Sequence, residues 1–97
     1  MIYEVVISEA ATETFQDIRI QVENRWGTKY ADQFEERIAR VLEIISSAPY
    51  AFKSTTFDLN IRKAFIHRNC SMFYEIDGTI VTILFFWDNR QDPIFLQ

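Results

Sequence analysis

Basic residues that could bind a phosphate are not outnumbered by acidic ones in the second half of this chain. From Ala48 onward there are five basic and five acidic residues, whereas the stretch through Ser47 has five basic and nine acidic ones. If the second half forms a sheet, its basic residues could gather on one side of it and contact phosphate groups. The net charge of −4 argues against nonspecific nucleic-acid binding, which needs an excess of Lys and Arg. These basic residues are Lys53, Arg62, Lys63, Arg68 and Arg90.

Two further reactive residue types each occur once in the chain. His67 has no Asp matched to it in the sequence, so we expect a structural or surface residue rather than a general base. Cys70 has neither a partner His nor the local cations that activate a nucleophile, and we expect it to be a small strand residue. A single cysteine excludes an internal disulfide framework and a cysteine-rich zinc site. We expect no metal and no other cofactor.

Arg90 follows a strand whose start is marked by a turn. The dipeptide Asp77-Gly78 joins two apolar runs, which predicts a hairpin whose two turn positions both have positive φ. The second run, residues 79–87, ends on a charged corner. Arg90 stands there beside Asp88 and Asp92, which predicts a salt bridge that shapes the corner or a functional role for Arg90, and both can hold.

The elements that must position these residues follow from hydrophobic spacing. Residues 2–7 alternate as a strand, and Ser8 can cap a helix that Gly27 ends. Thr28 can cap a second helix at once, and Pro49 closes it. Because the joint is so short, the two helices must fold back as an antiparallel pair.

Three strand-like runs follow the helices, at residues 59–68, 70–76 and 79–87. The order strand, helix, helix, strand, strand, strand predicts an α+β fold with the helix pair on one face of a small, largely antiparallel sheet. Ninety-seven residues with 48% apolar content form one domain, residues 1–97. The loop at residues 50–58 is expected to be irregular, with a short strand or turn as the alternative.

The last strand is apolar on both sides. Strict alternation places Val81, Ile83, Phe85 and Trp87 on one side and Ile80, Leu84 and Phe86 on the other. One side packs on the helices. The other must be covered by the tail residues Ile94, Phe95 and Leu96 or by a binding partner.

The start of the chain gives no sign of export or membrane insertion. It lacks a basic leader and the ~20 consecutive apolar residues that a membrane span needs. We therefore expect a soluble cytoplasmic protein with no membrane partner.

Taken in order, these features resemble the toxin of a RelE/ParE-type toxin–antitoxin (plasmid stabilisation) module. No single motif is specific, but their order and spacing cover essentially the whole chain. The matching residues are Tyr3, Val5 and Ser8-Glu9-Ala10-Ala11; Arg25-Trp26-Gly27 with Ala31 and Phe34; Pro49; Ile61-Arg62-Lys63; Phe73-Tyr74; and Asp88-Asn89-Arg90-Gln91-Asp92-Pro93.

The resemblance implies a βααβββ fold and a growth inhibitor that a cognate antitoxin neutralises. It also implies one of two targets. RelE-like members cut mRNA in the ribosomal A site without a metal, and ParE-like members poison DNA gyrase.

The residues that match the ribonuclease branch are incomplete. Arg62 and Arg90 match its two sheet arginines, and Lys53, His67 and Tyr74 are weaker catalytic candidates. Ser71 stands where the family often has an arginine, and the tail has Ile94-Phe95-Leu96 where the catalytic Tyr would stand. Because Phe cannot transfer a proton, these departures favour the ParE-like branch, with a ribosome-dependent mRNA nuclease or an inactive antitoxin-binding member as alternatives.

The resemblance also suggests two binding surfaces. Arg90, Asp92 and Phe95 are the candidates for binding the target. Tyr30, Phe34 and Ile38 are the candidates for an antitoxin groove along the helix pair, unless they are wholly core. An extended antitoxin segment could also add to a sheet edge. The acidic first half would favour an antitoxin segment that carries Lys or Arg.

Overall fold

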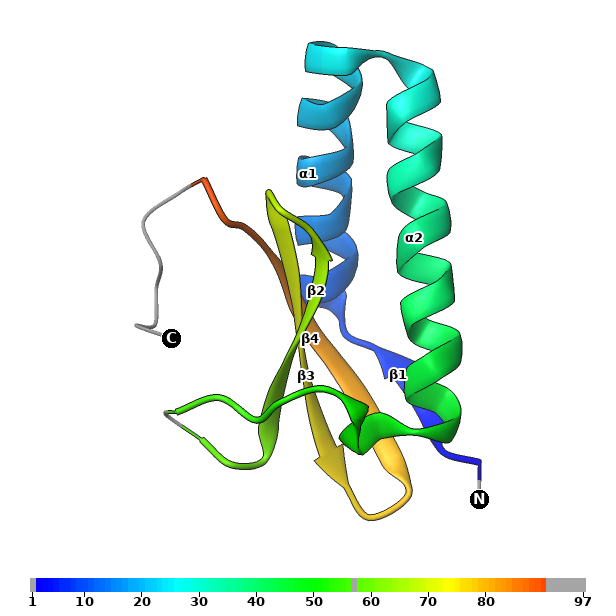
Figure 1. The fold of residues 1–97 in the computed structure, drawn as a ribbon, viewed down its shortest axis with the longest axis vertical. Helices are drawn as coiled ribbons and strands as arrows, with labels where there is room; N and C mark the ends of the chain where they lie inside the picture. The colour runs from blue at the N-terminus through cyan, green and yellow to red at the C-terminus, as the bar shows by residue number, and fades with distance from the viewer. Residues whose placement is uncertain (1, 57, 91–97) are drawn as a thin grey trace.

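The computed structural model describes residues 2–56 and 58–90, and it confirms the predicted α+β class and element order (Figure 1). One strand precedes two helices, and three strands follow. The elements are β1 (Glu4–Ile7), α1 (Glu9–Trp26), α2 (Thr28–Ser47), the short 3₁₀ helix η1 (Pro49–Ala51), β2 (Ile61–His67), β3 (Cys70–Asp77) and β4 (Ile80–Asp88).

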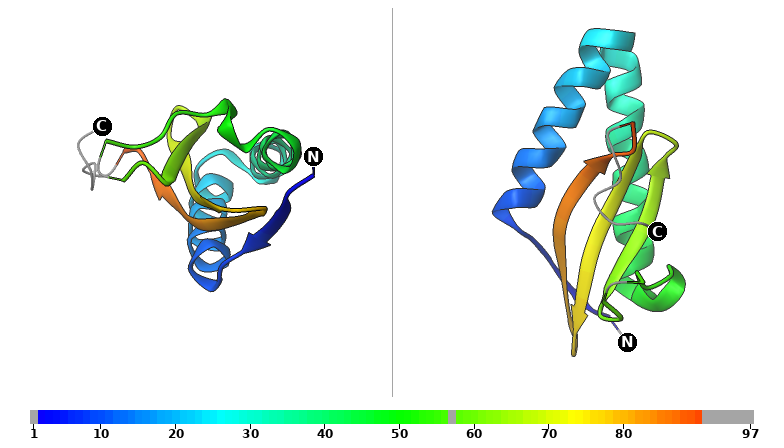
Figure 2. Two further views of the ribbon diagram at one scale, coloured as in Figure 1. Left: turned by 90° about the horizontal axis from the view of Figure 1, so that it is seen from below. Right: turned by 90° about the vertical axis from the view of Figure 1, so that its left-hand side faces the viewer.

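The sheet has the strand order β1-β4-β3-β2, with both helices on one of its faces (Figure 2). Strands β2, β3 and β4 pair antiparallel in a meander. Strand β1 pairs parallel to β4. The Glu4 amide donates to the Thr79 carbonyl at 2.8 Å, and the Ser8 amide donates to the Ile83 carbonyl at 3.1 Å. The first and last strands of the described chain are therefore neighbours.

Local capping at the first helix is as predicted, but at the second it is not. The Ser8 hydroxyl accepts a hydrogen bond from the Ala11 amide at 3.0 Å, so Ser8 is the N-cap of α1. Gly27, with φ of 98°, is both the C-cap of α1 and the N-cap of α2. The expectation that Thr28 caps α2 is wrong. Thr28 is already helical, and its hydroxyl donates to the Glu23 carboxylate at 3.0 Å.

The hairpin between β3 and β4 also differs from the prediction. Asp77 pairs with Ile80, so the two loop residues are Gly78 and Thr79. Gly78 has φ of 61°, and no described residue other than a glycine has positive φ. A positive φ at the first loop position alone fits a type II′ turn rather than the expected type I′ turn.

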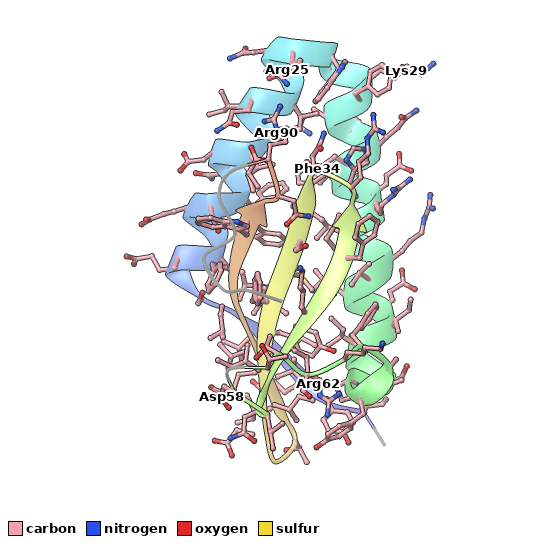
Figure 3. All side chains as sticks on the ribbon, turned by 60° about the vertical axis from the view of Figure 1, so that its left-hand side comes forward. Arg25, Lys29, Phe34, Asp58, Arg62 and Arg90 are labelled. Carbon is pink, nitrogen blue, oxygen red and sulfur yellow. The ribbon has the colours of Figure 1, made fainter. Side chains whose placement is uncertain are left out.

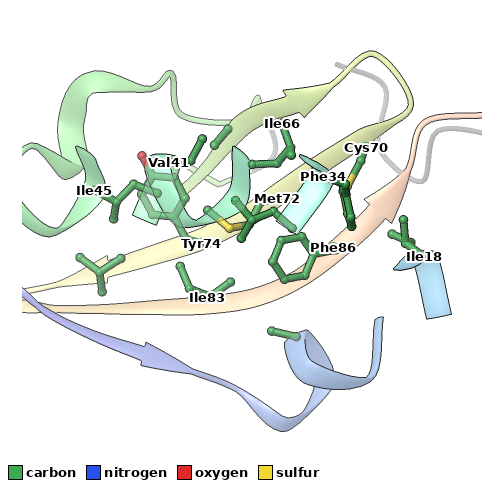
Figure 4. Packing of buried hydrophobic residues seen from close by; sticks show 14 residues of the cluster. Ile18, Phe34, Val41, Ile45, Ile66, Cys70, Met72, Tyr74, Ile83 and Phe86 are labelled. Carbon is green, nitrogen blue, oxygen red and sulfur yellow. The ribbon is translucent and has the colours of Figure 1, made fainter. Parts of the chain in front are cut away.

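The core lies between the helix pair and the sheet (Figure 4). Phe15 of α1 stacks on Phe34 of α2, with ring centroids 5.9 Å apart, and lies at the same distance from Phe86 of β4. Arg19 reinforces the helix pair from outside through ion pairs with Asp32 and Glu35, both at 3.1 Å. The packing of Phe15 on Phe86 fixes the helix pair to the sheet.

A bulge in β4 overturns the predicted division of its side chains. Phe73 pairs with Phe85 and Tyr74 pairs with Ile83, so Leu84 is the extra residue. Beyond it the alternation shifts by one. Phe86 packs in the core with Val81 and Ile83, whereas Phe85 stacks on Phe73 at 4.9 Å outside that cluster. The predicted grouping of Phe85 and Trp87 with Ile83 is therefore wrong.

Within residues 2–56 and 58–90, no helix combines the length and the apolar character required to span a bilayer.

Candidate functional site

A groove lies between the end of the helix pair where α1 joins α2 and the adjacent end of the sheet. It encloses about 400 Å³. Its walls come from both helices, from the turn between β2 and β3, and from the exit of β4. The lining residues are Ile18, Val22, Trp26, Tyr30, Gln33, Phe34, Arg37, His67, Arg68, Asn69, Cys70, Asp88 and Arg90.

Arg90 is held tightly at one side of this groove. Its Nε donates to Asp88 Oδ1 at 3.0 Å and its Nη2 donates to Asp88 Oδ2 at 2.8 Å, a two-point contact between guanidinium and carboxylate. Nη2 also donates to Gln21 Oε1 at 3.2 Å, and the guanidinium carbon lies 6.0 Å from the centre of the Trp26 ring. The hydrogen bond from Arg90 holds the pKa of Asp88 below its usual range. The predicted salt bridge between Arg90 and Asp88 is therefore present.

The opposite side of the groove is also basic. His67 and Arg68 extend from the end of β2, and Arg37 of α2 donates from Nη1 to the Ile66 carbonyl at 3.2 Å. The pKa of His67 lies below its usual value, because burial and then the charges of Arg37 and Arg68 disfavour a further positive charge. The Asn69 amide donates to His67 Nδ1 at 3.3 Å. The lowered pKa of His67 therefore favours its neutral form in this positive environment.

Arg62 lies at the other end of the sheet (Figure 3). It pairs in register with Tyr74, and Tyr74 pairs with Ile83, five residues before Asp88 on β4. Asp88 pairs with Cys70, four residues from Tyr74 on β3, so at about 3.3 Å per residue the backbones of Arg62 and Asp88 are offset by roughly 13 Å along the strands. The two arginines that match the ribonuclease pattern therefore do not meet.

Arg62 has its own partners at that end. Its Nη1 donates to the Phe52 carbonyl at 2.6 Å, and its guanidinium carbon lies 4.8 Å from the centre of the Tyr50 ring. The segment around Lys53 lies along the edge of β2, where Ser54 bridges to Arg62 and the Lys63 amide donates to the Lys53 carbonyl at 3.1 Å. The basic residues of the second half thus divide between the two ends of the sheet rather than gathering on one side.

Tyr74, a weaker catalytic candidate, is buried in the core. Its hydroxyl donates to the Pro49 carbonyl at 2.6 Å and its ring meets Phe52 edge-on, with centroids 6.4 Å apart. Burial raises the pKa of Tyr74 to about 12. This geometry suits a residue that fixes η1 to the sheet.

The three candidates for antitoxin binding have different positions. Phe34 and Ile38 belong to the buried core, although one edge of Phe34 reaches the groove. Tyr30 is 56% exposed and lines the groove. Two of the candidates for target binding, Asp92 and Phe95, lie outside the described residues.

Sequence reasoning missed most of the groove. Neither Arg37 nor Trp26 was among the candidate site residues, yet both line the groove, and Trp26 is 42% exposed. A signal was available, because Tyr30, Phe34 and Arg37 follow one another at helical spacing on one face of α2. Cys70 also reaches the groove wall, and burial raises the pKa of its thiol to about 12, as expected of a structural cysteine.

Comparison by sequence and comparison by structure give different results for this chain. Neither a protein-family profile nor a curated protein matches the chain. A structure from the chromosomal ParDE toxin–antitoxin system of P. aeruginosa aligns over 90% of this chain and 96% of its own, with a TM-score of 0.76 and 12% identity.

Two further structures align over similar lengths. The RelBE2 toxin–antitoxin complex of Mycobacterium tuberculosis covers 91% of this chain and 99% of the matched one, with a TM-score of 0.59 and 19% identity. The YoeB dimer of Staphylococcus aureus covers 90% and 97%, with a TM-score of 0.64 and 12% identity. The chain has the RelE/ParE toxin fold. In this RelE/ParE fold, the groove lies between the helix hairpin and the sheet end that carries Arg90.

Proposed function

We propose that this chain is the toxin of a type II toxin–antitoxin system, a growth inhibitor that a cognate antitoxin neutralises and that acts on DNA gyrase. The observation that carries the choice of target is the separation of Arg62 from Arg90, with each guanidinium held by partners of its own. The fold shared with the ParDE, RelBE2 and YoeB structures supports the toxin assignment.

The separation matters because of what RNA cleavage without a metal requires. A base must take the proton of the 2′-hydroxyl, an acid must protonate the leaving oxygen, and cations must stabilise the charge on the same phosphate. Arg62 and Arg90 are too far apart to contact one phosphate group. Tyr74 has its hydroxyl on the Pro49 carbonyl and a raised pKa, so it is poorly suited to proton transfer.

Inhibition of gyrase requires fewer precisely placed side chains than RNA cleavage does. It needs a stable binding surface and no set of converging catalytic groups. Arg90 at the exit of β4, with the residues that follow it, remains our proposed contact with the target. The TM-score to the ParDE structure is also higher than those to the RelBE2 and YoeB structures.

Controlled expression of the chain alone tests this proposal. We expect growth arrest with altered plasmid supercoiling and intact mRNA, and inhibition of supercoiling by the host's purified gyrase. Arg90→Ala should weaken both effects, whereas Arg40→Ala, a change of the same size on the exposed face of α2, should weaken neither. Normal supercoiling in the presence of excess purified protein would exclude gyrase as the target.

A ribosome-dependent mRNA nuclease is the second candidate, and the neighbourhood of His67 favours it. His67, whose pKa is lowered by burial and by the charges of Arg37 and Arg68, would combine a base with two phosphate-binding groups. In that case arrest would come with codon-phased cuts in translated mRNA, and His67→Ala would abolish them. No arrest at all would instead favour an inactive member that only binds antitoxin.

A further inference from the structure

Three basic side chains gather in the groove beside the turn between β2 and β3. Arg37 of α2, His67 and Arg68 all line it, and the charges of both arginines act on the His67 ring. Among the described lining residues Asp88 is the one carboxylate, and both of its oxygens accept from Arg90. Like charges that are held close together repel one another unless an anion lies among them. The basic cluster of Arg37, His67 and Arg68 therefore favours a bound anion.

Most N–H donors of this basic cluster have no partner within residues 2–56 and 58–90. Arg37 uses Nη1 on the Ile66 carbonyl, and Arg68 makes no side-chain hydrogen bond or ion pair in that part of the chain. The Asn69 amide donates to His67 Nδ1, so the neutral ring carries its proton on Nε2. A phosphate group suits such a set of donors, because it accepts several hydrogen bonds at once and guanidinium groups bind it with two N–H groups each.

The face of α2 along the groove leads from the basic cluster to an exposed aromatic ring. Tyr30, Gln33, Phe34 and Arg37 line the groove at helical spacing. Tyr30 and Arg37 are seven residues apart, which is roughly 10 Å along a helix. Phe34 is buried between them, whereas Tyr30 is largely exposed. A ligand that lies along this face would have an anionic group at Arg37 and a ring at Tyr30.

The size and the remaining polar group of the groove restrict the ligand further. A volume of about 400 Å³ is within the usual range for a pocket that takes one small molecule. A phosphate joined through a sugar to one aromatic base can extend from Arg37 to Tyr30, and the Tyr30 ring offers a surface for stacking of the base. The side-chain amide of Gln33 can both donate to and accept from the polar edge of a base. The groove thus has the chemistry of a mononucleotide site.

We propose that this groove binds a nucleoside 5′-monophosphate, with the phosphate on Arg37, His67 and Arg68 and the base against Tyr30. The inference goes beyond the inhibition of gyrase, because it assigns a small ligand to the groove and uses neither Arg90 nor the residues that follow it. The terminal phosphate is the distinguishing group. As a monoester it carries close to two negative charges near neutral pH, whereas each linking phosphate of a nucleic-acid strand carries one.

Calorimetric titration of the purified full chain tests the inference. The probes are the 5′-monophosphates of adenosine and uridine, the two nucleosides without phosphate, and inorganic phosphate. We expect at least one monophosphate to bind about tenfold more tightly than its nucleoside and than inorganic phosphate, because each of these makes only part of the contacts. Arg37→Gln and Arg68→Gln should each weaken its binding about tenfold. Tyr30→Ala should weaken the binding of the monophosphate but not that of inorganic phosphate.

Arg40→Gln is the matched control. Arg40 lies on the same helix, pairs with Glu36 at 3.7 Å and does not line the groove, so its substitution should change affinity by less than about twofold. Arg68→Gln removes no hydrogen bond or ion pair of the described residues, which separates lost binding from lost folding. Circular dichroism of each variant verifies folding.

His67, the only histidine of the chain, gives a second readout. In the free protein its pKa is lowered by burial and then by the charges of Arg37 and Arg68. A bound phosphate supplies negative charge beside the ring, so the pKa of His67 should rise with the monophosphate and stay unchanged with the nucleoside. NMR titration of the ring protons measures this difference.

Four results would overturn the proposal. They are no binding of either monophosphate, equal affinity for a monophosphate and its nucleoside, and inorganic phosphate that binds as tightly as the monophosphates and so assigns the site to the free anion. The fourth is tighter binding of an RNA trinucleotide that lacks a terminal phosphate, weakened by Arg68→Gln, which would assign the groove to a nucleic-acid strand. None of these measurements uses growth arrest or gyrase, so failure of the proposed function and failure of this inference can be told apart.

Discussion

Replacing Asp88 with Asn should destabilise the protein more than any other single change to a charged residue described above. The Asp88 carboxylate accepts from Arg90 Nε at 3.0 Å, from Arg90 Nη2 at 2.8 Å and from the Arg90 amide at 2.9 Å. Asn keeps the shape of Asp88 but removes its charge and can satisfy only part of this set.

The magnitude follows from the exposure of the two partners. Hydrogen bonds to charged groups contribute roughly 1.5–3 kcal/mol, and breaking a fully buried ion pair costs about 3–5 kcal/mol. The Asp88 side chain is 7% exposed, but that of Arg90 is 32% exposed, so water compensates part of the loss. We expect the free energy of unfolding to fall by about 2 kcal/mol, which lowers Tm by about 10 °C in a domain of this size.

The pH dependence separates the charge from simple packing. Because folding lowers the pKa of Asp88, its ion pair stabilises the protein above the pKa of the unfolded chain and is lost as the pH falls through the lower folded-state value. Urea unfolding of wild type and Asp88→Asn should therefore differ by a constant amount near neutral pH, and the difference should shrink below about pH 4.

Asp17→Asn is the matched control for this experiment. Asp17 is an exposed residue of α1, and its substitution should change the free energy of unfolding by less than about 0.5 kcal/mol. A difference between wild type and Asp88→Asn that stays the same at low pH would refute the reasoning, since the loss would then come from packing and not from the ion pair.

Three further predictions concern residues other than the charged ones of the groove. Tyr74→Phe removes the hydrogen bond to the Pro49 carbonyl and should lower the free energy of unfolding by about 1–2 kcal/mol, measured by urea unfolding, while growth arrest persists. Cys70, whose pKa is raised to about 12, should react with iodoacetamide at pH 8 only after unfolding, as mass spectrometry would detect; rapid labelling of the folded protein would contradict its burial. Ser8→Ala removes the cap of α1 and should lower Tm by several degrees, whereas Ser47→Ala at the end of α2 should not.

Periodicity predicted the first strand and the two helices because each of them packs one face against the core. The alternation of residues 2–7 and the helical spacing from Ala11 to Trp26 both reflect packing on one core, and β1 and α1 lie where that spacing placed them. The direction of β1 did not follow, because it depends on hydrogen bonds to residues more than seventy positions away.

The side chains of β4 show where alternation fails. One extra residue at Leu84 moves every following side chain to the opposite face, and no local sequence feature marks this position. Hydrogen bonds from a distant part of the chain accompany the bulge. The Leu84 carbonyl accepts from the Ser8 hydroxyl at 2.8 Å, and the Phe86 amide donates to Thr14 Oγ1 at 2.9 Å. These bonds come from the first turns of α1, which a local reading of β4 cannot include.

The candidate site was predicted least well, because a groove is formed by residues that are distant in the sequence. The pairing of Arg90 with Asp88 was accessible, since the two are neighbours on one corner. The approach of Arg37 to His67 was not, because it depends on how α2 crosses the end of β2. Local charge relations could be predicted from the sequence, and those between distant elements could not.

The pairing of β1 with β4 also determines when the sheet can form during synthesis of the chain. Strand β1 leaves the ribosome well before its partner β4, because residues 80–88 follow it by more than seventy positions. Until β4 emerges, the Ser8 hydroxyl lacks the Leu84 carbonyl, and β1 has no neighbouring strand. Such long-range contacts form late, because the loop between them must close first. A nascent chain therefore cannot complete its sheet before residues 80–88 have been made, whatever the first helices have already formed.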